Sequence, residues 1–207
     1  MNPPAFPSPR LHFRHQPISG TLRHAMGRCA LGTVLVARSD RGLCAILLDD
    51  LPDALPVQLA GIFPGTCLEP APLHGELERV TALIDTGVCD PALDLDVGGT
   101  PFQQRVWQML CTIPVGQTVT YTDVAQQIGA PAAVRAVASA CAANVFAIAI
   151  PCHRVLRRDG LLTGYRWGIE RKRAQLQRER GGRLIYCAQP GAGAARAGAA
   201  GRRDWMA

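Results

Sequence analysis

The sequence has no run of roughly 18 or more apolar residues, so it offers no candidate for a membrane-spanning helix. Its first residues, MNPPAFPSPRLHFRHQ, lack the apolar stretch of a signal peptide, and we expect a cytoplasmic protein without a membrane partner. The eight cysteines stand singly, without a Cys-x-x-Cys pair or the histidine spacing of a zinc finger. The pattern therefore predicts no disulfide framework, no bound metal and no cofactor.

Lysine is almost missing as well, because Lys172 is the single lysine and all other basic side chains except histidine are arginines. Acidic residues outnumber basic ones in residues 1–100, whereas basic residues outnumber acidic ones in residues 101–180. The planar guanidinium group suits phosphate contacts. A basic face that is merely solvated explains the same counts, so phosphate binding needs a supporting motif.

The first hundred residues have the pattern of a small α/β unit. Two β-rich runs flank residues 39–42, which predicts a hairpin in which Gly42 takes a positive φ. Leu77, Val80 and Ile84 follow at i, i+3 and i+7, which predicts one face of a helix.

Glycine composition indicates how the chain is divided. Gly98-Gly99 marks a boundary. We therefore expect an α/β domain over residues 1–98, a second domain over residues 99–180, and a disordered tail rich in Gly, Ala and Arg over residues 181–207.

The second domain begins with a helix-start signal. Thr100, Pro101 and Gln103 have the positions of a capping box with proline in the first turn. Phe102, Val106 and Leu110 then repeat with helical spacing and predict a buried stripe.

Two shorter helices follow. Residues 120–123 predict a capped helix that Gly129 ends, and Pro131 is expected to start another, with Val137 and Cys141 facing inward. Two short helices broken by a glycine turn are a candidate helix-turn-helix, so we expect a mostly α domain. Such pairs are also common in proteins that do not bind nucleic acid.

The apolar run of residues 146–150 predicts a short buried strand that delivers Cys152. Positive charge nearby stabilises a thiolate, and we expect Arg154, Arg157 and Arg158 to supply it. A base and an orienting acid would complete a nucleophile site, with His153 acting through a water and Glu179 as candidate orienter.

Five segments carry a family resemblance: GTPFQQRVWQML, TVTYTDVAQQIG, AVRAVASACAAN, AIPCHRVL and DGLLTGYRWG. Together they resemble the O6-alkylguanine-DNA alkyltransferases, most closely the C-terminal half of the bacterial Ada protein. The likeness covers roughly residues 22–180 and is strong throughout residues 99–180. It implies a ribonuclease H-like α/β unit followed by a mostly α domain with a helix-turn-helix.

The resemblance also implies a chemistry, that of a methylated-DNA-protein-cysteine methyltransferase that inactivates itself. Cys152 would accept the alkyl group of O6-alkylguanine, and of O4-methylthymine, in DNA. His153 would remove the thiol proton through a water, with Glu179 behind it. Tyr121 would donate a hydrogen bond to the departing base, and Asn144 would tie the active-site turn to the helix-turn-helix. Each molecule would react once, because a thioether has no ready hydrolysis route.

A base must leave the stacked duplex to reach a buried sulfur. The resemblance implies that Arg135 fills the gap, from a helix that enters the minor groove. Ala132, Ala133 and Ala136 would let this helix approach closely, although alanines are also ordinary helix formers.

The same resemblance implies a substrate pocket. Tyr165 would line the alkyl site, backbone groups around Val155 and Arg166 would bind the base edge, and Trp167 belongs to the same stretch. The expected partner is double-stranded DNA with alkylated bases, bound by a monomer associated with the nucleoid.

Some features of relatives are missing. The upstream phosphotriester acceptor and regulatory domain of full-length Ada have no counterpart in this sequence, so a role in transcription is not implied. Some relatives hold zinc in the N-terminal unit, whereas Ser39 and Cys44 stand at the matching positions and predict none. Two other functions stay open: a helix-turn-helix regulator without chemistry, and a cysteine hydrolase with turnover on an acyl substrate.

Overall fold

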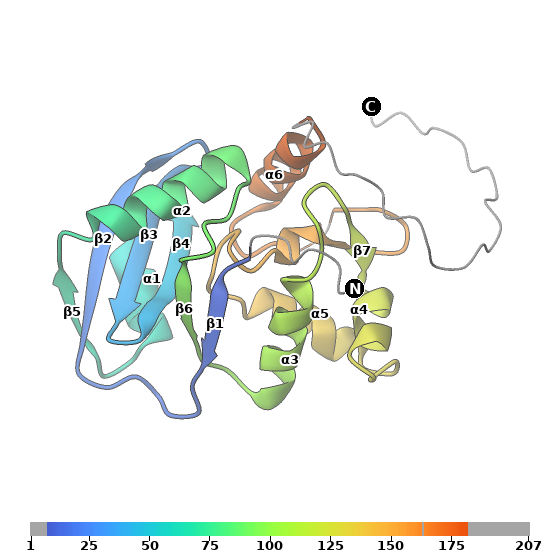
Figure 1. The fold of residues 1–207 in the computed structure, drawn as a ribbon, viewed down its shortest axis with the longest axis horizontal. Helices are drawn as coiled ribbons and strands as arrows, with labels where there is room; N and C mark the ends of the chain where they lie inside the picture. The colour runs from blue at the N-terminus through green and yellow to red at the C-terminus, as the bar shows by residue number, and fades with distance from the viewer. Residues whose placement is uncertain (1–7, 163, 182–207) are drawn as a thin grey trace.

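The computed structural model describes residues 8–162 and 164–181 (Figure 1). In this part of the chain one sheet has the strand order β1-β6-β4-β3-β2-β5, and β7 and β8 form a separate parallel pair. β3 pairs antiparallel with β2 on one side and with β4 on the other. The parallel pairs are β1 with β6, β6 with β4, and β2 with β5. The strand bounds are β1 (Arg10–Phe13), β2 (Thr21–Cys29), β3 (Gly32–Ser39), β4 (Gly42–Asp49), β5 (Cys67–Pro70), β6 (Asp94–Val97), β7 (Val119–Thr120) and β8 (Val155–Leu156).

Helices cover the sheet and form a second group beside it (Figure 1). α3, α4 and α5 lie together on the side of the molecule away from the sheet, and α6 lies above the junction between the two groups. The helix bounds are α1 (Ala54–Ile62), α2 (His74–Thr86), α3 (Pro101–Leu110), α4 (Tyr121–Gln127), α5 (Val134–Ala142), the 3-10 helix η1 (Cys152–Arg154) and α6 (Ile169–Gly181).

Both faces of the central strands are buried. Leu35 and Leu47 pack with Leu59 of α1 on one face, whereas Val36 and Ile46 belong to a larger cluster on the other. Burial on both faces explains why β4 is an almost continuous apolar run instead of an alternating one. The larger cluster also contains buried side chains of α2, α3, α4 and α5, so the two halves of the chain share one core.

This shared core fixes the segment that leads to Cys152. The backbone N–H of Ile46 in β4 donates to the carbonyl of Val145, and the Ile46 carbonyl accepts from the N–H of Ala147, each at 2.9 Å. The chain after α5 is thereby attached to the sheet.

The strongest local signals are confirmed. β3 and β4 form the predicted hairpin with Gly42 at φ 146°, and α2 buries Val80 and Ile84. The capping box at the start of α3 is complete, because Thr100 and Gln103 each bond the other's backbone N–H. β1, β5 and β6 were not anticipated, since four-residue strands gain their hydrogen bonds from strands far away in the sequence.

The start of α5 is a correction. Pro131 does not begin this helix, which starts at Val134. Pro131 and Ala132 lie in a turn, and the N–H of Ala133 donates to the carbonyl of Ala130 at 2.9 Å. Ala132 and Ala133 therefore precede the helix, and only Ala136 of the three alanines lies within it.

The domain boundary at residues 98–99 stays a prediction, because residues from both sides of it belong to one buried cluster. The predicted tail lies outside the described residues from position 182 onward. No helix within residues 8–162 and 164–181 is long and apolar enough to cross a membrane.

Candidate active site

Cys152 opens η1 at the end of a tight turn, not at the end of a strand. The predicted strand over residues 146–150 is wrong, because Ile150 N–H donates to the Phe146 carbonyl at 3.2 Å within the turn. In the described chain Phe146 forms one isolated bridge, to Ile46. A short buried apolar run has the same composition in a strand and in a packed turn, so the pattern was not able to distinguish them.

Asn144 holds this turn with its side chain. Its Nδ2 donates to the Ile150 carbonyl at 2.9 Å and lies 3.2 Å from Sγ of Cys152, and its Oδ1 accepts from Phe146 N–H at 2.9 Å. Asn144 is completely buried. The amide thus supplies the hydrogen bonds that a neighbouring strand would otherwise make, and it also contacts the thiol.

Ile148 lies within this turn at φ 64°, the one positive φ among the described residues other than glycine. A β-branched residue seldom adopts this conformation. Such strain persists where surrounding contacts impose it, and it is concentrated at functional sites. No local sequence pattern predicts this conformation at Ile148.

His153, Arg154 and Glu179 form a buried network. His153 Nε2 lies 2.8 Å from Glu179 Oε1, which is the contact expected from the sequence. Arg154 donates from Nε to Oε2 at 3.1 Å and from Nη2 to Oε1 at 2.9 Å. Its Nη1 donates to the Ile113 carbonyl at 2.6 Å, and Gly116 N–H donates to Glu179 at 3.3 Å. The network therefore joins η1, α6 and the loop before β7.

The charges in this network are set by burial and pairing. Burial acts to raise the pKa of Glu179, but its hydrogen bonds and charges from His153 and Arg154 lower the pKa to about 2. Burial lowers the pKa of His153, against the effect of Glu179. We therefore assign Glu179 as ionised and His153 as neutral near pH 7, with Arg154 as the cation that balances Glu179.

This assignment leaves one nitrogen of His153 free to accept a proton. Nε2–H donates to Glu179, so Nδ1 carries the lone pair. Nδ1 is buried and has no hydrogen-bond partner among the described residues. A neutral imidazole with a free lone pair is suited to act as a general base.

The electrostatics of the thiol differ from the expectation. Burial raises the pKa of Cys152, while the Asn144 hydrogen bond and the charges of Lys172 and Arg166 lower it. Arg154 instead pairs with Glu179, and Arg157 pairs with Asp159 at 3.0 Å on the surface. Arg154 and Arg157 thus have carboxylate partners of their own, whereas the expected action of Arg158 on the thiol stays a prediction.

Lys172 was not predicted from the sequence in this role. It is buried on α6, and its Nζ donates to the Val155 carbonyl at 2.8 Å. Its charge influences the pKa of Cys152. The available signal was that the single lysine of the chain lies in a helix otherwise rich in arginine.

The other predicted site residues lie on α4, on β8 and in the loop before α6. Tyr121 begins α4, and burial together with the Cys141 and Cys152 thiols raises its pKa to about 12, so its hydroxyl stays protonated. Tyr165 and Trp167 meet edge to face, with ring centroids 5.2 Å apart. These two rings and Arg166 belong to the loop before α6, whereas Val155 is buried in β8.

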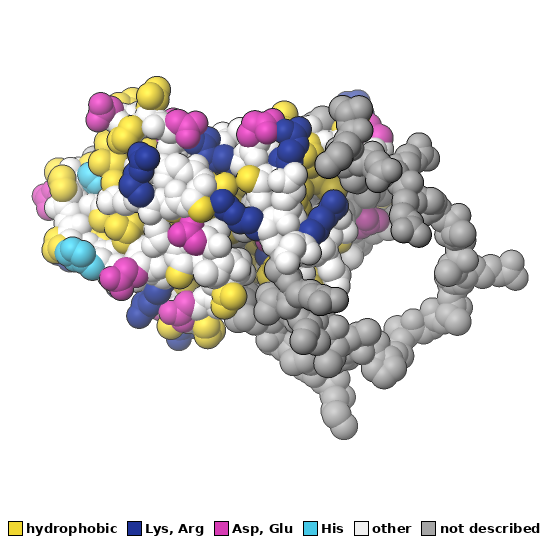
Figure 2. Space-filling view, turned by 90° about the horizontal axis from the view of Figure 1, so that it is seen from above, with side chains coloured by type: hydrophobic (Ala, Val, Ile, Leu, Met, Phe, Trp, Pro, Cys, Tyr) yellow, Lys and Arg dark blue, Asp and Glu magenta, His cyan; other side chains and the backbone are white. Residues whose placement is uncertain are grey.

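The predicted DNA-contacting residues lie elsewhere. Arg135 and Ala136 are exposed on α5, and Ala132 is exposed in the preceding turn. Arg135 has no carboxylate partner within the described chain. Figure 2 views another face, on the side of α2 and α6, where basic and acidic side chains are interspersed.

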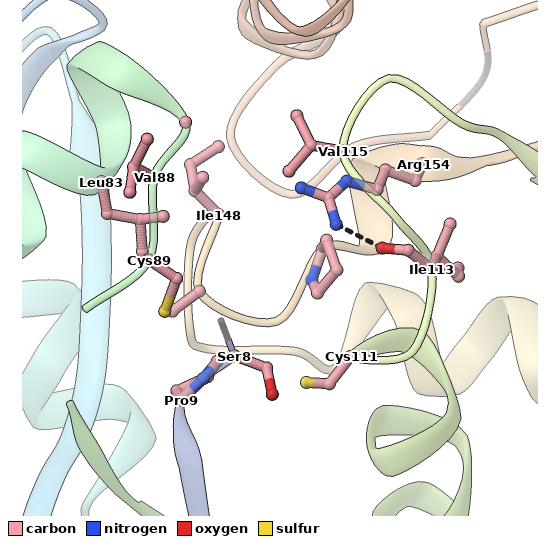
Figure 3. A pocket seen from close by; sticks show the side chains of 13 residues that line it. Ser8, Pro9, Leu83, Val88, Cys89, Cys111, Ile113, Val115, Ile148 and Arg154 are labelled. Carbon is pink, nitrogen blue, oxygen red and sulfur yellow. Dashed lines mark hydrogen bonds between the residues drawn. The ribbon is translucent and has the colours of Figure 1, made fainter. Parts of the chain in front are cut away.

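A cavity of about 170 Å³ lies beside the turn of residues 146–150 (Figure 3). Its lining residues include Ile148, Pro151, Cys89 and Cys111, and the hydrogen bond from Arg154 to the Ile113 carbonyl lies at its edge. Cys152 is not among its lining residues. Within the described ranges, no three His, Cys, Asp or Glu side chains gather as a metal site.

Comparison with known proteins identifies similar chains. The sequence profile of the 6-O-methylguanine DNA methyltransferase DNA-binding domain matches residues 101–181. The chain is 51% identical over 169 residues to the bifunctional transcriptional activator/DNA repair enzyme Ada of Escherichia coli, covering 81% of this chain and 48% of that protein. It spans about half the length of the Ada proteins that it matches.

A shorter relative is covered more fully. The methylated-DNA-protein-cysteine methyltransferase of Mycobacterium bovis is 46% identical over 112 residues, which cover 54% of this chain and 68% of that protein. Among solved structures, Mycobacterium tuberculosis OGT in complex with DNA matches with a TM-score of 0.64 and 35% identity, covering 78% of this chain and 93% of that chain.

Proposed function

Because the chain belongs to the methylated-DNA-protein-cysteine methyltransferase family, we propose that it repairs DNA by moving an alkyl group from O6-alkylguanine to its own Cys152. The observation that carries the proposal is the buried thiol held by Asn144, with the neutral His153 and ionised Glu179 beside it. This set provides a nucleophile, a base and an orienting acid at one point in the fold.

The proposed reaction is a single displacement. Sγ of Cys152 forms a bond to the alkyl carbon, the bond from that carbon to O6 breaks, and its electron pair passes to the guanine. The thiol proton passes through a water to Nδ1 of His153, and Glu179 stabilises the imidazolium that results. The thioether has no good leaving group, so each molecule reacts once.

Tyr121 is proposed to assist the departing base. Its hydroxyl is protonated because burial raises its pKa to about 12, so it is able to donate a hydrogen bond while negative charge develops on the guanine. The backbone around Val155 and Arg166 is proposed to bind the base edge, and Tyr165 with Trp167 to wall the alkyl pocket.

We interpret α4 and α5 as a helix-turn-helix whose second helix enters the minor groove of a duplex. Gly129, at φ 72°, makes the turn between the helices, and Arg135 projects from the exposed side of α5. Arg135 would occupy the space left by the flipped nucleotide. We further propose that the protein acts as a monomer and that its N-terminal sheet is ribonuclease H-like.

The function is tested by incubating the protein with duplex DNA that carries labelled O6-methylguanine and mapping the label by peptide mass spectrometry. We expect methyl on Cys152, with the reaction ending at one equivalent per chain. Continued turnover would instead indicate a hydrolase. Sequence-specific binding with an unmodified Cys152 would indicate a regulator without chemistry.

Replacing Arg135 by alanine is expected to slow repair of duplex DNA roughly tenfold, because unstacking a base costs a few kcal/mol. The reaction with a free O6-methylguanine base should change by less than about twofold, since no base then needs to be flipped. Rate constants measured on both substrates check this, with Arg23→Ala as the control, an exposed arginine of β2. Equal losses on both substrates would show that Arg135 does not act through the duplex.

A further inference from the structure

The region around α6 contains most of the buried polar atoms that lack a hydrogen-bond partner in the described chain. They include both amide atoms of Gln175, the Tyr165 hydroxyl, Trp167 Nε1 and His153 Nδ1. Folded proteins leave few such atoms unpaired, and ordered water is the usual partner of those that remain. Gln175 is the most pronounced case, because it is completely buried and neither end of its amide is bonded.

The periodicity of α6 places Gln175. Arg171, Gln175 and Glu179 are spaced at i, i+4 and i+8, so they lie in one row along the helix. Arg171 at one end donates to the Trp167 carbonyl at 2.8 Å, and Glu179 at the other end contacts His153 at 2.8 Å. Gln175 therefore lies between Arg171, which holds the loop that contains Trp167, and Glu179, which contacts His153.

Tyr165 is connected to the same row of α6 residues through Trp167. Its ring meets that of Trp167 edge to face, and the Trp167 backbone is held by Arg171. The pKa of Tyr165 is raised by burial and by the charges of Cys152 and Glu179, and Arg171 acts against this. Tyr165 also packs against the buried cluster that contains Cys152 and Trp167, and its hydroxyl oxygen is buried without a hydrogen-bond partner in the described chain.

A water needs two to four polar partners in a buried site. The two amide atoms of Gln175 and the Tyr165 hydroxyl provide three, and no protein group in the described chain satisfies them. We propose that Gln175 is a positioning residue, which fixes the ring of Tyr165 beside Cys152 through a water shared by its amide and the Tyr165 hydroxyl. The proposal rests on the proposed alkyl transfer to Cys152, and it makes the bound water a determinant of how large an alkyl group the pocket accepts.

The test is a double-mutant cycle with two lesions. Gln175→Leu, Tyr165→Phe and the double variant are compared with the unchanged protein on duplexes carrying O6-methylguanine or O6-butylguanine. Each single variant should slow butyl transfer roughly tenfold, and the double variant should be no slower than either, because the same water is lost in all three. Methyl transfer by Gln175→Leu should change less than about threefold, since a methyl group does not reach the far wall of the pocket.

Gln177→Leu is the matched control, an exposed glutamine on the same helix, and it should leave both rates unchanged. Multiplicative effects in the double variant, or equal losses on both lesions, would overturn the proposal. The midpoint temperatures of thermal unfolding form a second cycle that does not depend on activity. The sum of the two midpoint shifts of the single variants should exceed the midpoint shift of the double variant. An unchanged protein that transfers no alkyl group would refute the function itself, whereas additive unfolding shifts would refute the coupling of Gln175 to Tyr165.

Discussion

Replacing Cys152 by alanine is expected to abolish alkyl transfer, with a loss of at least about a thousandfold, while binding to undamaged duplex changes less than about threefold. The reason is that no other described thiol has comparable surroundings. Burial raises the pKa of Cys44 and of Cys111 to about 12. Burial also raises the pKa of Cys152, but this thiol alone receives a hydrogen bond from Asn144 together with the charges of Lys172 and Arg166.

Transfer is measured as label on the protein after incubation with duplex containing O6-methylguanine, and binding is measured by anisotropy on the unmodified duplex. Cys67→Ala is the matched control, because Cys67 is exposed in β5 at a distance in the fold from the catalytic network. Label on a different cysteine in Cys152→Ala would show that the acceptor is assigned wrongly. A loss of binding as large as the loss of transfer would show that the substitution acts on the fold.

Glu179→Gln is expected to destabilise the protein by about 3–5 kcal/mol and to slow alkyl transfer roughly a hundredfold or more. The amide keeps the size of the side chain but removes the negative charge, which leaves the Arg154 guanidinium largely buried without its counter-charge. It also removes the group that stabilises a protonated His153. Urea unfolding and single-turnover rates near pH 7 measure the two effects.

The same carboxylate predicts how stability depends on pH. The pKa of Glu179 is lowered from 4.5 to about 2 in the folded chain, so its ionisation stabilises the fold fully above about pH 4.5. That contribution, about 3 kcal/mol, is lost as the pH falls toward 2. Glu179→Gln should lack this acid-dependent component, whereas Glu170→Gln, on the exposed side of α6, should retain it. An unchanged acid dependence in Glu179→Gln would show that the carboxylate is not ionised by its partners.

The family resemblance inferred from the five segments is confirmed by the comparisons, and local rules predicted several elements correctly. The capping boxes of α3 and α4 were predictable because each involves residues three positions apart. The hairpin was predictable for the same reason, since Gly42 supplies a positive φ within the turn itself. The turn at residues 146–150 was not predictable, because its position depends on backbone hydrogen bonds to Ile46 on a strand that is distant in the sequence.

The sequence by itself determined the family and the helices whose start and stop signals are local, and it singled out Cys152 as the proposed nucleophile. Only the tertiary structure decided which charges act on Cys152, because Arg154 is two residues away in sequence yet turns toward Glu179, whereas Lys172 is twenty residues away and its charge lowers the pKa of the thiol. It also buried the Gln175 amide without a hydrogen-bond partner in the described chain. Electrostatic and hydrogen-bond effects depend on distance in space and on burial, and neither quantity is encoded in the spacing of residues along the chain.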